Sequence, residues 1–223
     1  SGAPMIAAIL GALKAGKIYV PLDPSMPRAR TGFILEESEA GLVVTNGRNR
    51  AMAAALAASR RPLIDIDALG APLSTESPDL PIAPSAPAWI LYTSGSTGQP
   101  KGVVQTHENV LHFVMIYAQG LGLRPSDRLT LLFSCAVNAG AHDIFTALLT
   151  GASLHVLDVK GEGVAGLAGW LAESVISKFV GAQNVGRDLA PHVHTKTIFT
   201  LFQSPAFHCF NDLLSFFGSS AKW

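Results

Sequence analysis

Short apolar runs alternate with helically spaced apolar residues through most of the chain, and this rhythm constrains the fold more than any other feature. In residues 4–14 the apolar side chains recur at helical spacing, with Pro4 near the start and Gly16 after the end. Further elements are predicted in the first third: helices at residues 28–37 and 48–58, strands at 18–20 and 63–65, and a buried strand at 42–44. Strands that alternate with helices favour a parallel sheet covered by helices, so we assign the chain to the α/β class.

The rhythm resumes after residues 70–87, which are rich in proline and serine and predict a surface connector. The elements expected beyond it are strands at residues 88–93, 102–105, 129–133 and 153–157, and helices at 109–121, 143–149 and 164–173. After about Val175 the pattern weakens. Residues 178–195 show no clear period, and residues 198–217 are unusually rich in phenylalanine.

Composition narrows the class of protein. Hydrophobic residues make up 48% of the 223 residues and charged residues 14%, which is typical of a globular chain and excludes a disordered one. The 16 basic and 16 acidic residues cancel, and no apolar run reaches the roughly 18 residues of a membrane span, so we expect neither a nucleic-acid nor a membrane partner. Cys135 and Cys209 have no zinc-site spacing and fit free thiols in a reducing compartment, which predicts a cytoplasmic protein.

The stretch from Thr93 to Gly102 has the chemistry of a phosphate-binding loop. Gly95 and Gly98 permit unusual backbone angles and leave amide N–H groups open to a ligand. The loop adds hydroxyl donors and one cation: Thr93, Ser94, Ser96, Thr97 and Lys101. A polyphosphate needs many donors on a backbone that it can approach closely, so these residues predict a polyphosphate site.

The loop differs from two familiar nucleotide-binding motifs. A Walker A motif would place glycine directly before Lys101, where this chain has Pro100, and the GxGxxG pattern is also absent from the loop. The alternative interpretation is a polar surface hairpin between two strands. Four hydroxyls, two glycines and a Pro-Lys-Gly ending favour the phosphate site.

Residues 91–102, which read LYTSGSTGQPKG, resemble the signature loop of the acyl-adenylate-forming superfamily. Its members include acyl-CoA synthetases, luciferases and the adenylation domains of nonribosomal peptide synthetases. Residues 13–24 and 143–152 narrow the resemblance to the adenylation domains. The resemblance implies an α/β fold with parallel-rich sheets, as a partial N-terminal domain of an AMP-forming ligase. It also implies that the loop holds the phosphates of ATP, with Mg²⁺, while a carboxylate attacks the α-phosphate to give an acyl-adenylate and pyrophosphate.

One position departs from the adenylation-domain pattern. In these relatives an Asp, five residues before the acidic residue of the helix at residues 143–149, binds the α-ammonium group of the substrate. Counting back from Asp143 gives Asn138, a neutral amide that binds an ammonium less strongly than a carboxylate does. Because an amide can pair with a hydroxyl, the departure counts against an α-amino acid and favours an aryl or 2-hydroxy acid. The alternative is that Asn138 caps a helix starting near Gly140.

Other candidate residues have more than one interpretation. The same mapping places Ala139 and His142 in the acid pocket, although His142 also fits a surface or cap histidine. His107 fits the first residue of a helix. His192 and His194 have no third ligand at a suitable spacing, so we expect no metal site on the protein, and Mg²⁺ arrives with ATP.

Later segments of the superfamily, including its catalytic Lys, are not found in this sequence. The opening Ser1-Gly2-Ala3-Pro4 lacks an initiator Met and the charged start of a signal peptide, which predicts an N-terminus cut from a longer protein. We interpret residues 1–175 as a partial N-terminal core of an adenylation domain. Residues 176–223 are interpreted as a divergent or inserted tail, or as the start of the family's next strand and helix.

Three functions therefore stay open. In the first, the chain is part of a synthetase that activates an amino, hydroxy or aryl acid for transfer to a phosphopantetheine carrier domain. The second is an acyl- or aryl-CoA ligase, against which residues 19–23 count, and the third is a truncated, non-catalytic ATP-binding module.

Overall fold

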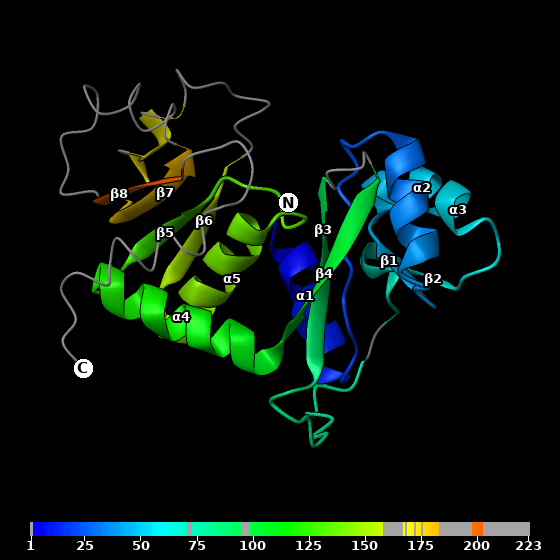
Figure 1. The fold of residues 1–223 in the computed structure, drawn as a ribbon, viewed down its shortest axis with the longest axis horizontal. Helices are drawn as coiled ribbons and strands as arrows, with labels where there is room; N and C mark the ends of the chain where they lie inside the picture. Colours follow the sequence, from blue (N-terminus) through cyan, green and yellow to red (C-terminus); the bar gives the residue numbers. More distant parts are fainter. Residues whose placement is uncertain are drawn as a thin grey trace. The chain divides into compact units, whose positions relative to one another are not determined.

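The computed structural model describes residues 2–70, 73–94, 99–157, 167, 169–171, 173–174, 176–182 and 198–202. The chain divides into two compact units, Ser1–Leu111 with Ser134–Ala141, and His112–Phe133 with His142–Trp223. Figure 1 labels the helices and strands of both units.

The first unit starts with the helix that the sequence predicts. α1 (Ala3–Lys14) has a proline in its first turn and ends where Gly16 takes a positive φ of 64°. The Gly16 N–H donates to the Leu13 carbonyl, and the Lys17 N–H donates to the Ala12 carbonyl, each at 2.9 Å. These two bonds form a Schellman motif, in which a glycine in the left-handed region lets the last carbonyls of a helix find donors.

A small βαβ arrangement follows α2 (Arg28–Glu37). Its elements are β1 (Val43–Thr45), η1 (Gly47–Asn49), α3 (Arg50–Ala57), β2 (Leu63–Asp65) and η2 (Ile66–Ala68). β1 and β2 pair in parallel, and α2 and α3 lie beside them (Figure 1). Their shared core is Leu35, Val43, Ala53 and Ala57. The predicted bounds of α2 and β2 are confirmed.

The expectation of a buried strand at residues 42–44 is wrong for two of its three residues. Val43 is buried, whereas Leu42 and Val44 are 44% and 45% exposed. Successive side chains of a strand point to opposite faces. Val43 packs into the core formed with side chains of α2 and α3. Leu42 and Val44 point to the opposite face and are exposed to solvent.

An antiparallel hairpin completes the secondary structure of the first unit. It joins β3 (Pro87–Ser94) to β4 (Pro100–Thr106) (Figure 1). The predicted strand at residues 18–20 is reduced to one parallel bridge, between Tyr19 and Trp89. Their rings also contact each other, with centroids 5.6 Å apart. Trp89 is fully buried, so the hairpin is anchored on this side by an aromatic pair.

The second unit is built on a four-stranded parallel sheet with the order β6-β5-β7-β8. The strands are β5 (Arg128–Leu131), β6 (Ser153–Val156), β7 (Lys178–Ala182) and β8 (Ile198–Phe202). Two helices continue into this unit, α4 (His107–Leu121) and α5 (Asn138–Thr150). Leu129 of β5 packs with Ala147 of α5 in its core. Parallel pairing in the β1–β2 sheet and in the four-stranded sheet confirms the predicted fold class, while the β3–β4 hairpin is antiparallel.

β7 lies in a stretch whose sequence predicts neither helix nor strand. Hydrogen bonds of the Ser177 side chain, directly before β7, connect this strand to the start of β5. Ser177 Oγ accepts a hydrogen bond from the Arg128 N–H and donates one to Asp127 Oδ1, both at 2.8 Å. The next residue, Lys178, then lies opposite Leu129 in the sheet. One serine therefore sets the register between β5 and β7.

Two further expectations concern helices. Leu167, Gly169–Leu171 and Glu173 are helical, in agreement with the helix predicted at residues 164–173. Among the helices that the structure describes, none has the length and apolar character needed to cross a lipid bilayer.

Candidate functional site

The loop end of the β3–β4 hairpin, where the chain passes from one strand to the other, carries the described part of the predicted phosphate loop. Thr93 lies opposite Lys101, and Ser94 lies opposite Pro100. The Thr93 hydroxyl also approaches the Lys101 carbonyl at 3.5 Å. The side chain of Lys101 is exposed, so its ammonium group is free to reach a ligand. The hairpin therefore brings hydroxyl donors and one cation to the same end.

The remaining residues predicted for this loop, Gly95, Ser96, Thr97 and Gly98, lie outside the described residues. Their role in holding phosphate stays a prediction.

Backbone and side-chain caps fix the other end of the hairpin. The His107 N–H donates to the Ala86 carbonyl (3.1 Å), and the Glu108 N–H donates to the Pro84 carbonyl (2.8 Å). Thr106 Oγ1 accepts from the Asn109 N–H at 3.3 Å, as an N-terminal cap does. His107 is thus the first residue of α4, in agreement with its interpretation as the first residue of a helix.

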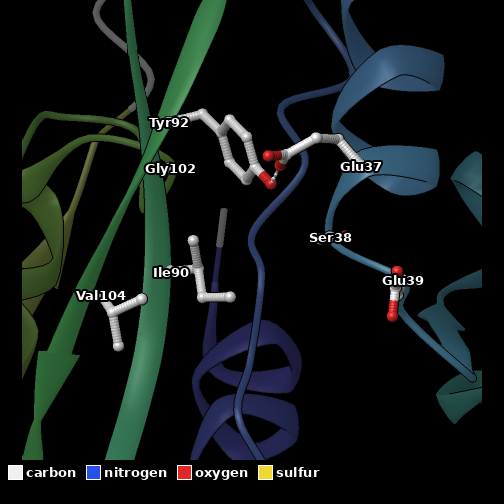
Figure 2. A pocket seen from close by; sticks show the side chains of 7 residues that line it. All are labelled: Glu37, Ser38, Glu39, Ile90, Tyr92, Gly102 and Val104. Carbon is white, nitrogen blue, oxygen red and sulfur yellow. Dashed lines mark hydrogen bonds between the residues drawn. The ribbon is translucent and has the colours of Figure 1, made fainter.

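A tight contact lies one residue pair below the phosphate loop. Tyr92 lies opposite Gly102, and a Cβ added to Gly102 would meet Tyr92 Cζ at 3.2 Å and Ile90 Cγ2 at 3.0 Å. The Tyr92 hydroxyl donates a hydrogen bond to the Glu37 carboxylate at the end of α2 (Figure 2). No side chain other than hydrogen fits at position 102 without displacing a neighbour.

A cavity of about 250 Å³ borders this contact. Glu37 and Glu39 line it from the end of α2, and Ile90, Tyr92 and Val104 line it from the hairpin (Figure 2). Sequence reasoning missed Tyr92 and Glu37, because 55 residues separate them.

The predicted acid-binding residues lie at the start of α5. Asn138 and Ala139 are its first two residues, and His142 follows one turn later. The helix starts two residues before Gly140, so Asn138 belongs to the helix and does not precede it as a cap. The Ala141 N–H donates to the Val137 carbonyl (3.2 Å), which closes the first turn.

The segment that carries Asn138 and Ala139 follows β5 in the chain. β6 lies on one side of β5, and β7 and β8 lie on the other, so the path of the chain reverses at β5. In open parallel sheets, ligands bind beyond the carboxyl ends of the strands at such a point. The chain that leaves the carboxyl end of β5 leads directly to Asn138 and Ala139.

His142 is half-buried and stacks on an aromatic ring of α4. Its imidazole lies 3.4 Å from the ring of Phe113, centroid to centroid, with the planes 16° apart. Burial disfavours the charged imidazolium and lowers the pKa of His142 to about 4. His142 is therefore neutral near pH 7. Phe113 has no sequence signal that would have singled it out.

Asp143 follows His142 and is 2% exposed. Burial raises the pKa of its carboxyl well above the usual range. Its Oδ2 has no hydrogen-bond partner among the described residues, and neither has Thr146 Oγ1 one turn later. The turn that carries the candidate acid-binding residues is thus neutral on its buried side.

No metal site is built by the protein where the structure describes it. No group of three or more His, Cys, Asp or Glu side chains that could hold a metal ion is found among these residues. His192 and His194 lie outside the described part of the chain.

Curated sequence relatives are large peptide synthases. Tyrocidine synthase 2 of Brevibacillus parabrevis is 40% identical over 157 residues, which cover 70% of this chain and 4% of the synthase. Surfactin synthase subunit 2 of Bacillus subtilis (strain 168) is 34% identical over 158 residues, again 70% of this chain and 4% of that protein. The chain thus spans a small fraction of the length of these relatives.

Solved structures with the same fold include two kinds of enzyme. The nonribosomal peptide synthetase FmoA3 matches with a TM-score of 0.76 and 27% identity, over 87% of this chain and 20% of that one. O-succinylbenzoate coenzyme A synthetase of Bacillus subtilis matches with a TM-score of 0.78 and 21% identity, over 98% of this chain and 46% of that one. The second likeness concerns the fold alone. The model of the family described as "AMP-binding enzyme" matches residues 1–206, and the chain belongs to that family.

Proposed function

We propose that the chain is the nucleotide-binding core of an adenylation domain, which activates a carboxylic acid with ATP. The carboxylate attacks the α-phosphate, an acyl-adenylate forms, and pyrophosphate leaves. The observation that carries the proposal is the end of the β3–β4 hairpin, where Thr93, Ser94 and Lys101 gather in a chain of the AMP-binding enzyme family.

ATP is the nucleotide that the loop chemistry and the relatives support. FmoA3 has been solved with AMPPNP bound, and the O-succinylbenzoate synthetase with ATP and a magnesium ion. In this chain the exposed Lys101 ammonium would contact the outer phosphates, and Thr93 and Ser94 would donate to phosphate oxygens. Gly95, Ser96, Thr97 and Gly98 would add backbone N–H and hydroxyl donors. Mg²⁺ would come with the nucleotide, since it keeps several waters and needs few protein ligands.

Asn138, Ala139 and His142 would bind the acid. FmoA3 has also been solved with α-methyl-L-serine-AMP, a nucleotide linked to an amino acid. Here Asn138 supplies an amide in place of a carboxylate, and His142 is neutral near pH 7. Neither would balance the charge of an α-ammonium group. We therefore propose an aryl or 2-hydroxy acid as the substrate, and an amino acid as the less favoured class.

A carrier domain is the proposed acceptor of the activated acid. The synthases of tyrocidine and surfactin are the relatives that suggest it. We also propose that residues 176–206 continue the adenylation core. The family match extends to residue 206, and β7 and β8 extend the parallel sheet of β5 and β6, which supports this boundary.

ATP titration of the parent chain and of the Lys101→Ala variant tests the nucleotide site. We expect Lys101→Ala to weaken ATP binding at least tenfold, since it removes a charge-assisted contact worth roughly 1.5–3 kcal/mol. Lys17→Ala, which removes another exposed lysine, serves as the matched control and should bind like the parent chain. An unchanged affinity in Lys101→Ala would remove the loop assignment.

Acid-dependent exchange of labelled pyrophosphate into ATP tests the reaction. The assay is run on the chain and on any longer protein that carries it, with panels of aryl, 2-hydroxy and α-amino acids and without coenzyme A. Exchange that depends on an aryl or 2-hydroxy acid supports the proposal. Exchange that is equally fast without any acid refutes it, and exchange restricted to α-amino acids refutes the role given to Asn138.

A further inference from the structure

The ring of Tyr92 is held in one position by two contacts of different kinds. On one side it lies against Gly102 of the neighbouring strand, where a Cβ would come within 3.2 Å of Tyr92 Cζ. At its tip the hydroxyl donates a hydrogen bond to the Glu37 carboxylate (Figure 2). A hydrogen bond to a carboxylate is stronger than one between neutral groups.

Packing alone leaves the ring room to move. Tyr92 borders the cavity of about 250 Å³ that also touches Glu39 and Val104. This cavity lies at the surface, since Glu37, Glu39 and Val104 on its wall are exposed, so the ring has fewer packing contacts there than a buried side chain has. The bond to Glu37 therefore adds to the packing that holds the ring over Gly102.

The position of this bond ties it to the phosphate loop. Tyr92 and Gly102 are paired residues of the hairpin, and the next pair is Thr93 with Lys101. Any movement of the backbone at Tyr92 is passed directly to these two neighbours. Glu37 is the last residue of α2, so the bond fastens the loop end of the hairpin to a helix of the same unit.

We propose that Tyr92 and Glu37 are positioning residues for nucleotide binding, because their hydrogen bond fixes the end of the hairpin that carries Thr93, Ser94 and Lys101. The inference rests on the proposed function of that hairpin end. Neither residue touches the nucleotide. Gly102 is the third member of this arrangement, since any side chain larger than hydrogen at this position would displace the Tyr92 ring.

Four variants test the proposal by ATP titration. Tyr92→Phe removes the donor, and Glu37→Ala removes the acceptor. Glu37→Gln keeps an acceptor at the same place. Glu39→Ala is the matched control, because it removes a carboxylate from the wall of the same cavity without touching the hydrogen bond.

We expect Tyr92→Phe and Glu37→Ala each to weaken ATP binding by roughly five- to tenfold, less than the full effect of a lost hydrogen bond to a charged group, because this bond acts on the nucleotide only through the hairpin. The double variant should bind no more weakly than either single variant, because both remove the same bond. Glu37→Gln should recover most of the affinity, and Glu39→Ala should match the parent chain. Unchanged affinity in Tyr92→Phe, or an equal loss in Glu39→Ala, overturns the proposal.

Amide hydrogen exchange gives a second measurement that needs no nucleotide. Tyr92→Phe and Glu37→Ala should speed exchange at residues 92–94 and 101–103, while β1 and β5 exchange as in the parent chain. Uniformly faster exchange in all strands indicates a general loss of stability and overturns the positioning role. A parent chain that binds no ATP refutes the proposed function, and exchange then still decides whether the bond holds the hairpin end.

Discussion

The imidazole of His142 lies flat against the ring of Phe113, with centroids 3.4 Å apart and planes 16° apart. The two residues come from α5 and α4, and both belong to the second unit. The stack covers one face of a histidine whose neutral form is already favoured by burial. It links the candidate acid-binding turn to a side chain that no sequence pattern identified.

Phe113→Leu should raise the pKa of His142 from about 4 toward its ordinary value of 6.5. The smaller side chain uncovers the imidazole, so the charged form is better hydrated. The measurement is an NMR titration of the His142 ring protons. Met115→Ala changes an exposed residue of the same helix and should leave the titration unchanged. A His142 pKa still near 4 in Phe113→Leu contradicts the stacked geometry.

The stability of the chain should fall as the pH drops from about 6.5 to about 4 because of His142. In this window the unfolded chain binds a proton at His142 and the folded chain does not, so acid favours unfolding. His142→Gln removes this contribution, and its free energy of unfolding should depend less on pH over that range. Urea unfolding at pH 7 and at pH 4.5 measures the difference. Equal pH dependence in the two proteins would mean that His142 titrates normally.

The pH dependence of stability that comes from Asp143 should have the opposite sign to that of His142, and Asp143→Asn tests this. The pKa of the buried Asp143 is raised, so the folded chain keeps a proton there that the unfolded chain loses above pH 3.8. Its contribution to stability is present at low pH and is lost as the pH rises. The amide cannot ionise, so the variant should be stabilised more at pH 7 than at pH 4 relative to the parent. A variant that is less stable at pH 7 than the parent indicates an ionised, paired carboxylate.

Ala58→Gly should stabilise the chain by about 1 kcal/mol, because Ala58 ends α3 in the left-handed region, which is costly for any residue with a Cβ. Its φ is 49°. Ala55→Gly, three residues earlier inside the same helix, should destabilise by about 1 kcal/mol through the low helix propensity of glycine. Urea unfolding of both variants gives the two signs. The same sign in both would contradict the left-handed cap.

Ser177→Ala should destabilise the second unit by about 1–2 kcal/mol, because it leaves the Arg128 N–H without its acceptor and removes a donor to Asp127. Ser126→Ala replaces an exposed serine nearby and should change stability by less than about 0.5 kcal/mol. Hydrogen exchange at the Arg128 amide should also accelerate in Ser177→Ala alone.

Local patterns in the sequence predicted most elements of the fold. The bounds of α2 and β2 agree with prediction, and a proline stands directly before each element, Pro27 before α2 and Pro62 before β2. α5 starts five residues before the predicted position. Its first turn, Asn138 to His142, is mostly small or polar and has no apolar period to read. β7 depends on the long-range bridge at Ser177, which no local pattern contains.

The candidate site likewise contains some residues that the sequence identified and some contacts that it did not. Thr93, Ser94 and Lys101 could be identified because they lie within one short stretch of the sequence that is rich in hydroxyl groups and glycine. The Tyr92–Glu37 bond spans 55 residues, and the stack of His142 on Phe113 joins two helices. Contacts of this kind depend on how elements pack, so only the structure reveals them.

The fit of Gly102 beneath the Tyr92 ring has a consequence for how this chain can change over generations. A Cβ at position 102 would come within 3.0 Å of Ile90 Cγ2 and 3.2 Å of Tyr92 Cζ, so both side chains would have to move to accept it. A replacement at position 102 is therefore tolerated more readily when positions 90 and 92 both carry smaller side chains. Relatives that have lost the glycine should also carry smaller residues at these two positions, so the three positions should change together.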